Sequence, residues 1–392
     1  MINQEMYALG SNRSVIRELF EYGKMRAQVV GAENVFDYSL GNPCIPAPKE
    51  VEQTIRDLLQ DTDSLQLHGY TSAVGDLQTR AAIAQDLNDR YDAGVCPEDL
   101  FIGSGAAPEL VAVLKALSAP GAEVLAIAPY FPEYKAFAQQ AGLNFRVVSA
   151  DIPAFQINFT ALESMITEKT VAIIVNSPNN PSGAVYTQAT LQKLTDLLTE
   201  KSRQYGNPVY IIADEPYREL VYDGGAAPFI PHIYPNTVVC YSYSKSLSLP
   251  GERIGYIYVP KQAQDSEKLY AAIAGAARVC GHVCAPSLWQ KVIARCTHLR
   301  PDLVAYDKNR KALYQGLVDA GYEVAKPDGA FYLFVKAPGG DGMAFSQKAK
   351  EKDVLVVPGE GFGCPGYFRL CYCVSHDTIQ KSLPIFRQLI ED

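Results

Sequence analysis

The sequence lacks any apolar run long enough to cross a membrane. Although 48% of its 392 residues are hydrophobic, no stretch reaches the about 20 consecutive apolar residues of a membrane-spanning helix. The opening segment, MINQEMYALGSNRS, has no basic stretch followed by an apolar one, as a secretory signal would have. We therefore expect a cytoplasmic protein with no membrane partner.

Positive charge is also scarce. Lysine and arginine together number 35 against 43 acidic residues, which gives a net charge of -8. The chain has no basic tract of the kind that binds nucleic acid or anionic lipid. A nucleic-acid partner is therefore not expected.

The cysteines have no pattern typical of a metal or disulfide site. The closest spacings, Cys280-x3-Cys284 and Cys371-x-Cys373, have no second Cys or His cluster beside them, as zinc sites need. The chain has nine cysteines, and this odd number favours reduced, mostly buried thiols. We expect no metal site, and free thiols at positions 44, 96, 240, 280, 284, 296, 364, 371 and 373.

Short β-branched runs alternate with helical patterns through the middle of the chain. Runs this continuously apolar are typical of strands buried on both faces, so the alternation predicts an α/β fold with a largely parallel sheet. The expected strands are 123–128, 145–148, 171–176, 209–214, 237–243 and 254–259; the expected helices are 108–117, 134–141, 187–200 and 263–276.

The last third of the chain has a different pattern. GYEVAKPDGAFYLFV, DVLVVPG and YFRLCYCV read as strands, with helices at 302–320 and 377–389. We predict a small α+β domain from residues 1–45 and 290–392, and a large α/β domain from 46–289. No low-complexity linker separates them, so their shared cleft is the expected ligand site.

Two segments contain residues that suit a phosphoanion. In the first, Ser242, Ser244, Lys245 and Arg253 cluster on a loop leaving the sheet, where a phosphate could bind beside a reactive amine. A solvated lysine is the alternative. The second is FIGSGAAPEL (101–110), in which small residues precede a helix start, and such a start can bind an anion. It lacks the third glycine and the acidic residue of a dinucleotide fingerprint, which argues against an NAD-binding protein.

Two further segments are polar at strand ends. NSPNNPSGAVY (176–186) is a turn-rich segment whose simplest interpretation is a plain loop. Asp214 ends the apolar run before DEPYREL, where an unpaired buried carboxylate would be costly. It therefore needs a cationic or hydrogen-bonding partner; a protonated pyridine nitrogen would be one, and an arginine elsewhere in the chain would be another.

Together these segments resemble pyridoxal-phosphate (PLP) enzymes of fold type I, in particular class I/II aminotransferases of the aspartate, aromatic and alanine group. The resemblance spans nearly the whole chain, and its most specific motifs are NNPSG, DEPY and SKSLSLPGERIGY. It implies a large domain with a mostly parallel, seven-stranded-type sheet flanked by helices, plus a smaller α+β domain.

The resemblance also implies roles for individual residues. Lys245 matches the lysine that forms the Schiff base with the cofactor and later moves the substrate Cα proton. Asp214 matches the partner of the pyridine nitrogen, Asn180 and Tyr217 match the donors to its phenolate oxygen, and Phe131 matches the stacking aromatic. The matched phosphate ligands are Gly105, Ala106, Ser242, Ser244, Arg253 and, from the other subunit of a homodimer, Tyr70.

Gly41, Asn180 and Arg369 match the site for the substrate α-carboxylate. An arginine on a solvated strand face is the alternative for Arg369, whereas the guanidinium fork would suit a carboxylate. Arg278 is better interpreted as a surface or interface arginine. His68 and His282 could line the cleft and are assigned no role.

The resemblance implies amino-group transfer from an L-amino acid to a 2-oxo acid by a ping-pong route through pyridoxamine phosphate. A carbon–sulfur β-lyase on the same fold is the alternative, because reaction choice depends on which Cα bond stands perpendicular to the cofactor ring. A PLP-sensing regulator without enzyme activity is disfavoured, since such proteins carry a DNA-binding extension.

Overall fold

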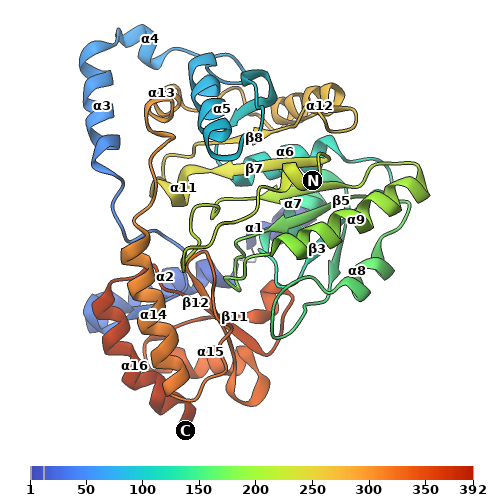
Figure 1. Cartoon of the computed structure of the whole chain (residues 1–392). Helices are drawn as coiled ribbons and strands as arrows, with labels where there is room; N and C mark the ends of the chain where they lie inside the picture. Colours follow the sequence, from blue (N-terminus) through green and yellow to red (C-terminus); the bar gives the residue numbers. More distant parts are fainter. Residues whose placement is uncertain (1, 12–13, 392) are drawn as a thin grey trace.

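The computed structural model describes residues 2–11 and 14–391. Its centre is a seven-stranded sheet with the order β2-β8-β7-β6-β5-β3-β4 (Figure 1). All neighbouring strands are parallel except that β8 runs antiparallel to both β7 and β2. The strands are β2 (Leu100–Gly103), β3 (Glu123–Ile127), β4 (Asn144–Val148), β5 (Thr170–Asn176), β6 (Tyr210–Asp214), β7 (Thr237–Ser242) and β8 (Gly255–Tyr258).

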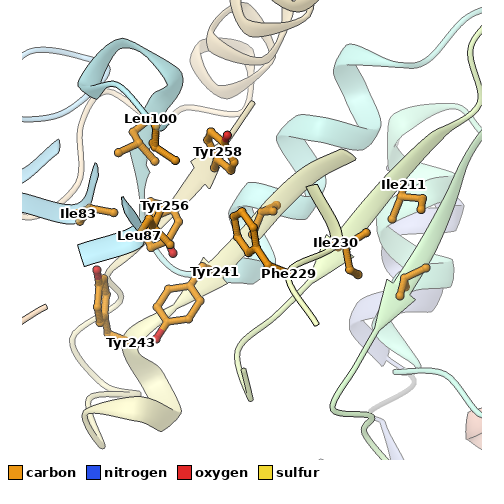
Figure 2. Packing of buried hydrophobic residues seen from close by; sticks show 14 of the residues in the cluster. Ile83, Leu87, Leu100, Ile211, Phe229, Ile230, Tyr241, Tyr243, Tyr256 and Tyr258 are labelled. Atoms are coloured by element: carbon orange, nitrogen blue, oxygen red, sulfur yellow. The ribbon is translucent and has the colours of Figure 1, made fainter. Parts of the chain in front are cut away.

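Both faces of this sheet are covered, which explains why its strands read as continuous apolar runs. Along β6, Ile211 points into one hydrophobic cluster and Ile212 into the cluster on the opposite face. On the first face, Tyr241 and Tyr256 stack with their ring centroids 4.8 Å apart (Figure 2). The covering helices are α3 (Lys49–Asp61), α4 (Ser64–His68), α5 (Leu77–Tyr91), α6 (Ala106–Ala116), α7 (Glu133–Ala141), α8 (Phe159–Met165), α9 (Gln188–Tyr205), α10 (Ile230–Ile233), α12 (Ser266–Val279) and α13 (Ser287–Cys296).

A second, smaller α+β unit contains the C-terminal segment. Its antiparallel sheet has the order β11-β12-β9, and the short strand β1 near the N-terminus pairs in parallel with β10. The elements are α2 (Val15–Val30), β1 (Phe36–Asp37), α14 (Leu303–Asp319), β9 (Tyr332–Lys336), α15 (Gly342–Glu351), β10 (Val354–Leu355), β11 (Val357–Pro358), β12 (Tyr367–Cys371) and α16 (His376–Glu391). Helix α1 (Gln4–Ser11) precedes them and buries none of its residues.

These observations confirm the predicted fold class, a mostly parallel seven-stranded sheet flanked by helices with a smaller α+β unit. The limits of the small domain, 1–45 and 290–392, and of the large domain, 46–289, stay a prediction. Residues 1, 12, 13 and 392 of the predicted small domain lie outside the described residues. None of the helices in residues 2–11 and 14–391 is both long and apolar enough to span a membrane.

Two local expectations were wrong. The sequence predicts no strand at residues 100–103, yet β2 forms there and pairs with β8 at the sheet edge. The sequence also places Lys245 on a loop, whereas the residue lies in the one-turn helix α11 (Tyr243–Ser246) directly after β7. The Ser242 side chain caps this turn by accepting a hydrogen bond from the Ser244 amide.

The nine cysteines are all free thiols. Five of them are buried, and only Cys44 and Cys280 are exposed. Among the described residues, no three His, Cys, Asp or Glu side chains group so that they could hold a metal ion.

Candidate active site

A cavity of about 260 Å³ lies at the carboxyl ends of three neighbouring parallel strands. β5, β6 and β7 end at Asn176, Asp214 and Ser242, and all three side chains line it. The opposite wall comes from the small sheet, so the cavity lies between the two units, as ligand sites of α/β proteins commonly do. Its lining is Ile16, Leu40, Gly41, Ala106, Ala107, Leu110, Phe131, Asn176, Asn180, Asp214, Pro216, Tyr217, Ser242, Ser244, Lys245, Pro250, Arg253, Tyr332 and Arg369.

Asp214 is a buried carboxylate with one unused oxygen. Its Oδ2 accepts a short hydrogen bond from the Tyr134 hydroxyl and a longer one, 3.5 Å, from Asn176 Nδ2. Its Oδ1 is buried and has no partner among the described residues. Burial raises the pKa of Asp214 from 3.8 to about 7, despite the opposing hydrogen bond from Tyr134. A cationic donor in the cavity would satisfy the free oxygen and favour the ionised carboxylate.

Lys245 is held against the backbone of a distant segment. Its Nζ donates a 2.6 Å hydrogen bond to the Gly41 carbonyl and lies 5.4 Å from the Phe331 ring centroid. Burial lowers the pKa of Lys245, and the nearby guanidinium groups of Arg253 and Arg369 act in the same direction. A lowered pKa makes the neutral, nucleophilic amine more available at neutral pH.

The N-terminus of α6 and Arg253 form a cup of hydrogen-bond donors. Gly105 caps the helix with a positive φ of 87°, and a Cβ there would lie 2.6 Å from Arg253 Nη2. Only glycine therefore lets the guanidinium approach the helix start this closely. Arg253 Nη1 also donates to the Pro250 carbonyl at 3.0 Å, and to Ser244 Oγ at 3.4 Å. Free helix-start amides beside a guanidinium are suited to a phosphate.

Arg369 is a buried cation with no carboxylate partner of its own. It is 2% exposed, donates from Nη1 to Asn180 Oδ1 at 3.0 Å and from Nη2 to the Ser39 carbonyl, and its Nε has no partner. Its guanidinium carbon lies 4.7 Å from the Tyr332 ring centroid. The part of the chain that the structure describes contains no ion pair to it. Because a buried unpaired charge is costly, this site calls for an anionic ligand, and the alternative of a solvated strand face does not hold.

The remaining expected residues complete the walls. The Tyr217 hydroxyl lies 2.9 Å from that of Tyr332, and Phe131 meets Tyr134 edge to face with centroids 5.6 Å apart. Gly41 passes so close to Tyr332 that a Cβ would collide with its hydroxyl.

Two expected site residues do not line this cavity: Gly105, which precedes the lining residue Ala106 at the start of α6, and Tyr70. Tyr70 is 90% exposed and does not line the cavity of its own chain.

Several residues next to the expected site residues are not predicted from the sequence. Tyr134 and Asn176 bind Asp214, Tyr332 contacts Tyr217, and Ile16 and Leu40 line the wall beside Lys245 and Arg369. Asn176 ends a buried apolar run just as Asp214 does, so its position at a strand end could have identified it. Nothing in the local pattern around Ile16 marks it as a cavity residue.

Comparison with known proteins adds an independent line of evidence. Residues 32–384 match the model of the family "Aminotransferase class I and II". An aspartate aminotransferase of Thermotoga maritima is 29% identical over 367 residues, covering 92% of each chain. A solved structure of an amino transferase from Eubacterium rectale is 55% identical, with a TM-score of 0.98, and covers 100% of this chain and 98% of that one. The aspartate aminotransferase of Thermus thermophilus with maleate is 25% identical with a TM-score of 0.86, covering 99% of both chains.

Proposed function

Because the chain belongs to the class I and II aminotransferases, we propose that the cavity at the ends of β5, β6 and β7 is its active site. The family membership confirms the predicted PLP-dependent transferase activity. The amino group moves between amino acids and 2-oxo acids, and the comparisons do not favour the carbon–sulfur lyase alternative. The single observation that carries the proposal is the convergence of Lys245, the free oxygen of Asp214 and the unpaired Arg369 on one cavity.

The cavity fits the cofactor at both of its ends. At one end, Asp214 Oδ1 is a buried acceptor without a partner among the described residues, which matches a protonated pyridine nitrogen. At the other, Gly105, Ala106, Ser242, Ser244 and Arg253 supply the donors that a phosphate needs. Bound there, PLP supplies an electron sink for the substrate Cα carbon.

The residues at and between the two ends of the cavity have separate roles in this proposal. We assign Asp214 to keep the ring nitrogen protonated, and Tyr134 and Asn176 to orient its carboxylate through their hydrogen bonds. Asn180 and Tyr217 line the wall between the two ends and would hold the phenolate oxygen, while Phe131 would cover one ring face. Each of these side chains except Phe131 is buried, which limits the access of water to the reacting atoms.

Lys245 and Arg369 divide the work on the substrate. Arg369 binds the α-carboxylate through its guanidinium, with Asn180 beside it. The two side chains bind backbone carbonyls that lie close together in the sequence. Arg369 Nη2 donates to the Ser39 carbonyl, and Lys245 Nζ donates to the Gly41 carbonyl. A substrate held by its carboxylate on Arg369 presents its Cα to Lys245. Lys245 would take the proton from the Cα of the donor amino acid in one half-reaction and give one to the Cα formed from the 2-oxo acid in the other.

We further propose that the enzyme is a homodimer in which Tyr70 binds the phosphate of the opposite subunit. The exposure of Tyr70, 90%, is accompanied by that of Leu65, 85%, and Leu77, 58%, in the same part of the chain. Exposed apolar side chains grouped this way favour an interface, and a two-fold axis would bring each Tyr70 to its partner. A cytoplasmic location remains part of the proposal.

Turnover of a substrate panel tests this function. The purified enzyme should transfer amino groups from one or more L-amino acids to 2-oxo acids, with the parallel double-reciprocal lines of a ping-pong reaction. Cystathionine serves as the contrasting substrate. Release of pyruvate from it, without amino transfer to any 2-oxo acid, would overturn the proposal.

A further inference from the structure

A second cavity, of about 180 Å³, lies behind the active site and contains two polar groups without partners among the described residues. Its lining comes from α6, from the end of α12 and the residues that follow it, and from the β2–β8 edge of the large sheet. Helix α6 separates the two cavities, because its residues Ala107 and Leu110 line the first and Glu109 and Val111 line the second. The active site proposed above makes no use of this second space.

The floor of the cavity is shaped around the carboxyl group of Glu109. This side chain is 2% exposed, and neither of its carboxyl oxygens has a hydrogen-bond partner in the described chain. Gly103 and Gly255 pair across β2 and β8 directly beneath it. A Cβ on Gly255 would lie 2.6 Å from Glu109 Oε1, and one on Gly103 would collide with the same atom. Because these two facing residues are glycines, the sheet leaves enough room for the Glu109 carboxyl.

His282 supplies the second free polar atom. Its Nδ1 lies 3.5 Å from Ser104 Oγ, and its buried Nε2 has no partner within residues 2–11 and 14–391. Burial lowers the pKa of His282, so the ring is neutral at physiological pH. A hydrogen bond between the ring and the Ile102 backbone opposes this lowering. In the tautomer that has its proton on Nδ1, Nε2 is an acceptor. Glu109 and His282 therefore both offer acceptors to the same space.

Most of the remaining lining is apolar and comes from Phe101, Pro108, Val111, Ala112, Ile257 and Ala277. The thiol-bearing residue Cys280 also lines the cavity. The volume exceeds that of a single ion or water molecule, which takes about 30 Å³. An anion is disfavoured beside Glu109, and a metal ion would lack ligands, since the described chain has no group of three metal-binding side chains.

We propose that this cavity is a second binding site, for a small organic cation with an apolar body, whose charged end pairs with Glu109 and hydrogen-bonds His282. The cation would pair with a buried carboxyl whose two oxygens have no partner among the described residues. Burial raises the pKa of Glu109 well above its usual range, with the charge of Arg253 opposing and that of Asp214 reinforcing the shift. A bound cation would shift Glu109 toward its ionised form.

Benzamidinium is a suitable probe, because its planar amidinium matches a carboxylate and it cannot condense with PLP as a primary amine would. We expect calorimetric titration of the PLP-loaded enzyme at pH 8 to give one site per chain. Glu109→Gln should weaken this binding about tenfold or more, as expected for loss of a charged hydrogen bond. Glu98→Gln, at an exposed carboxylate outside the cavity, is the matched control and should bind as the parent does.

A second variant covers the case in which Glu109→Gln does not fold. Val111 is only partly buried on α6, so Val111→Phe can fill the cavity from its rim and should abolish binding. No saturable binding by the parent enzyme would mean that the cavity holds only water. Binding left unchanged by Glu109→Gln or Val111→Phe would place the probe elsewhere. Either result overturns the proposal.

Discussion

Replacing Asp214 by asparagine should have opposite effects on the stability of the cofactor-free protein and on the activity of the loaded enzyme. An asparagine at this position would keep the size of the side chain and an acceptor for the Tyr134 hydroxyl, but it cannot ionise. The loaded enzyme should lose most of its activity, because the charge that keeps the ring nitrogen protonated is gone.

The effect on stability follows from the pKa of Asp214, which burial raises from 3.8 to about 7. Below pH 3.8 the carboxyl is protonated in both folded and unfolded chains, so it contributes no pH dependence. Between 3.8 and about 7 the unfolded chain releases the proton and the folded chain retains it, so the parent loses stability as pH rises. At about 1.4 kcal/mol per pH unit, this interval corresponds to about 4 kcal/mol, which is an upper value.

Urea denaturation of the cofactor-free parent and Asp214→Asn proteins, at several values between about pH 5 and 8, measures this difference. The variant should be the more stable protein, by a margin that grows with pH and levels off above about pH 7. Glu168→Gln, at an exposed carboxylate, controls for the loss of one negative charge and should track the parent. Stability curves for parent and Asp214→Asn that stay parallel across the range would refute the argument that the carboxyl is buried without compensation.

Three further predictions concern the other residues of the site. Lys245→Ala should remove the borohydride-sensitive visible absorption of the purified enzyme and slow turnover by about 10² to 10⁴, the usual contribution of a positioned proton carrier; transamination at the parent rate would exclude Lys245. Arg369→Lys should weaken the binding of every good substrate by about 2 to 3 kcal/mol while cofactor affinity stays the same, because a point charge cannot replace the guanidinium fork; an unchanged KM would place Arg369 outside the site. Tyr70→Phe should raise the cofactor Kd by the equivalent of about 1 kcal/mol, and dimers mixed from Tyr70→Phe and Lys245→Ala chains should regain one intact site. Mixed dimers whose activity at limiting cofactor stays at the average of the two parents would show that Tyr70 serves its own subunit.

The amino-acid sequence alone determined the fold class and named the residues that we propose carry the chemistry. Strands such as β5 and β6 were predictable because a sheet covered on both faces requires apolar side chains at every position. The same reasoning identified Asp214, since a carboxylate at the end of such a run needs a partner. The roles of Lys245, Arg253 and Arg369 were expected from motifs, and the structure brings all three to one cavity.

Tertiary structure alone decided which side chains meet. The hydrogen bond from Tyr134 to Asp214 joins residues 80 positions apart, and the placement of Ile16 on the cavity wall depends on how α2 packs. β2 was not predicted, and it lies at the sheet edge, where it pairs only with β8. Tertiary structure alone also decided that the free carboxyl of Glu109 lies in the same cavity as His282. Sequence periodicity reports which face of an element is buried, but the partners of a buried polar atom are set by packing between elements that are distant along the chain.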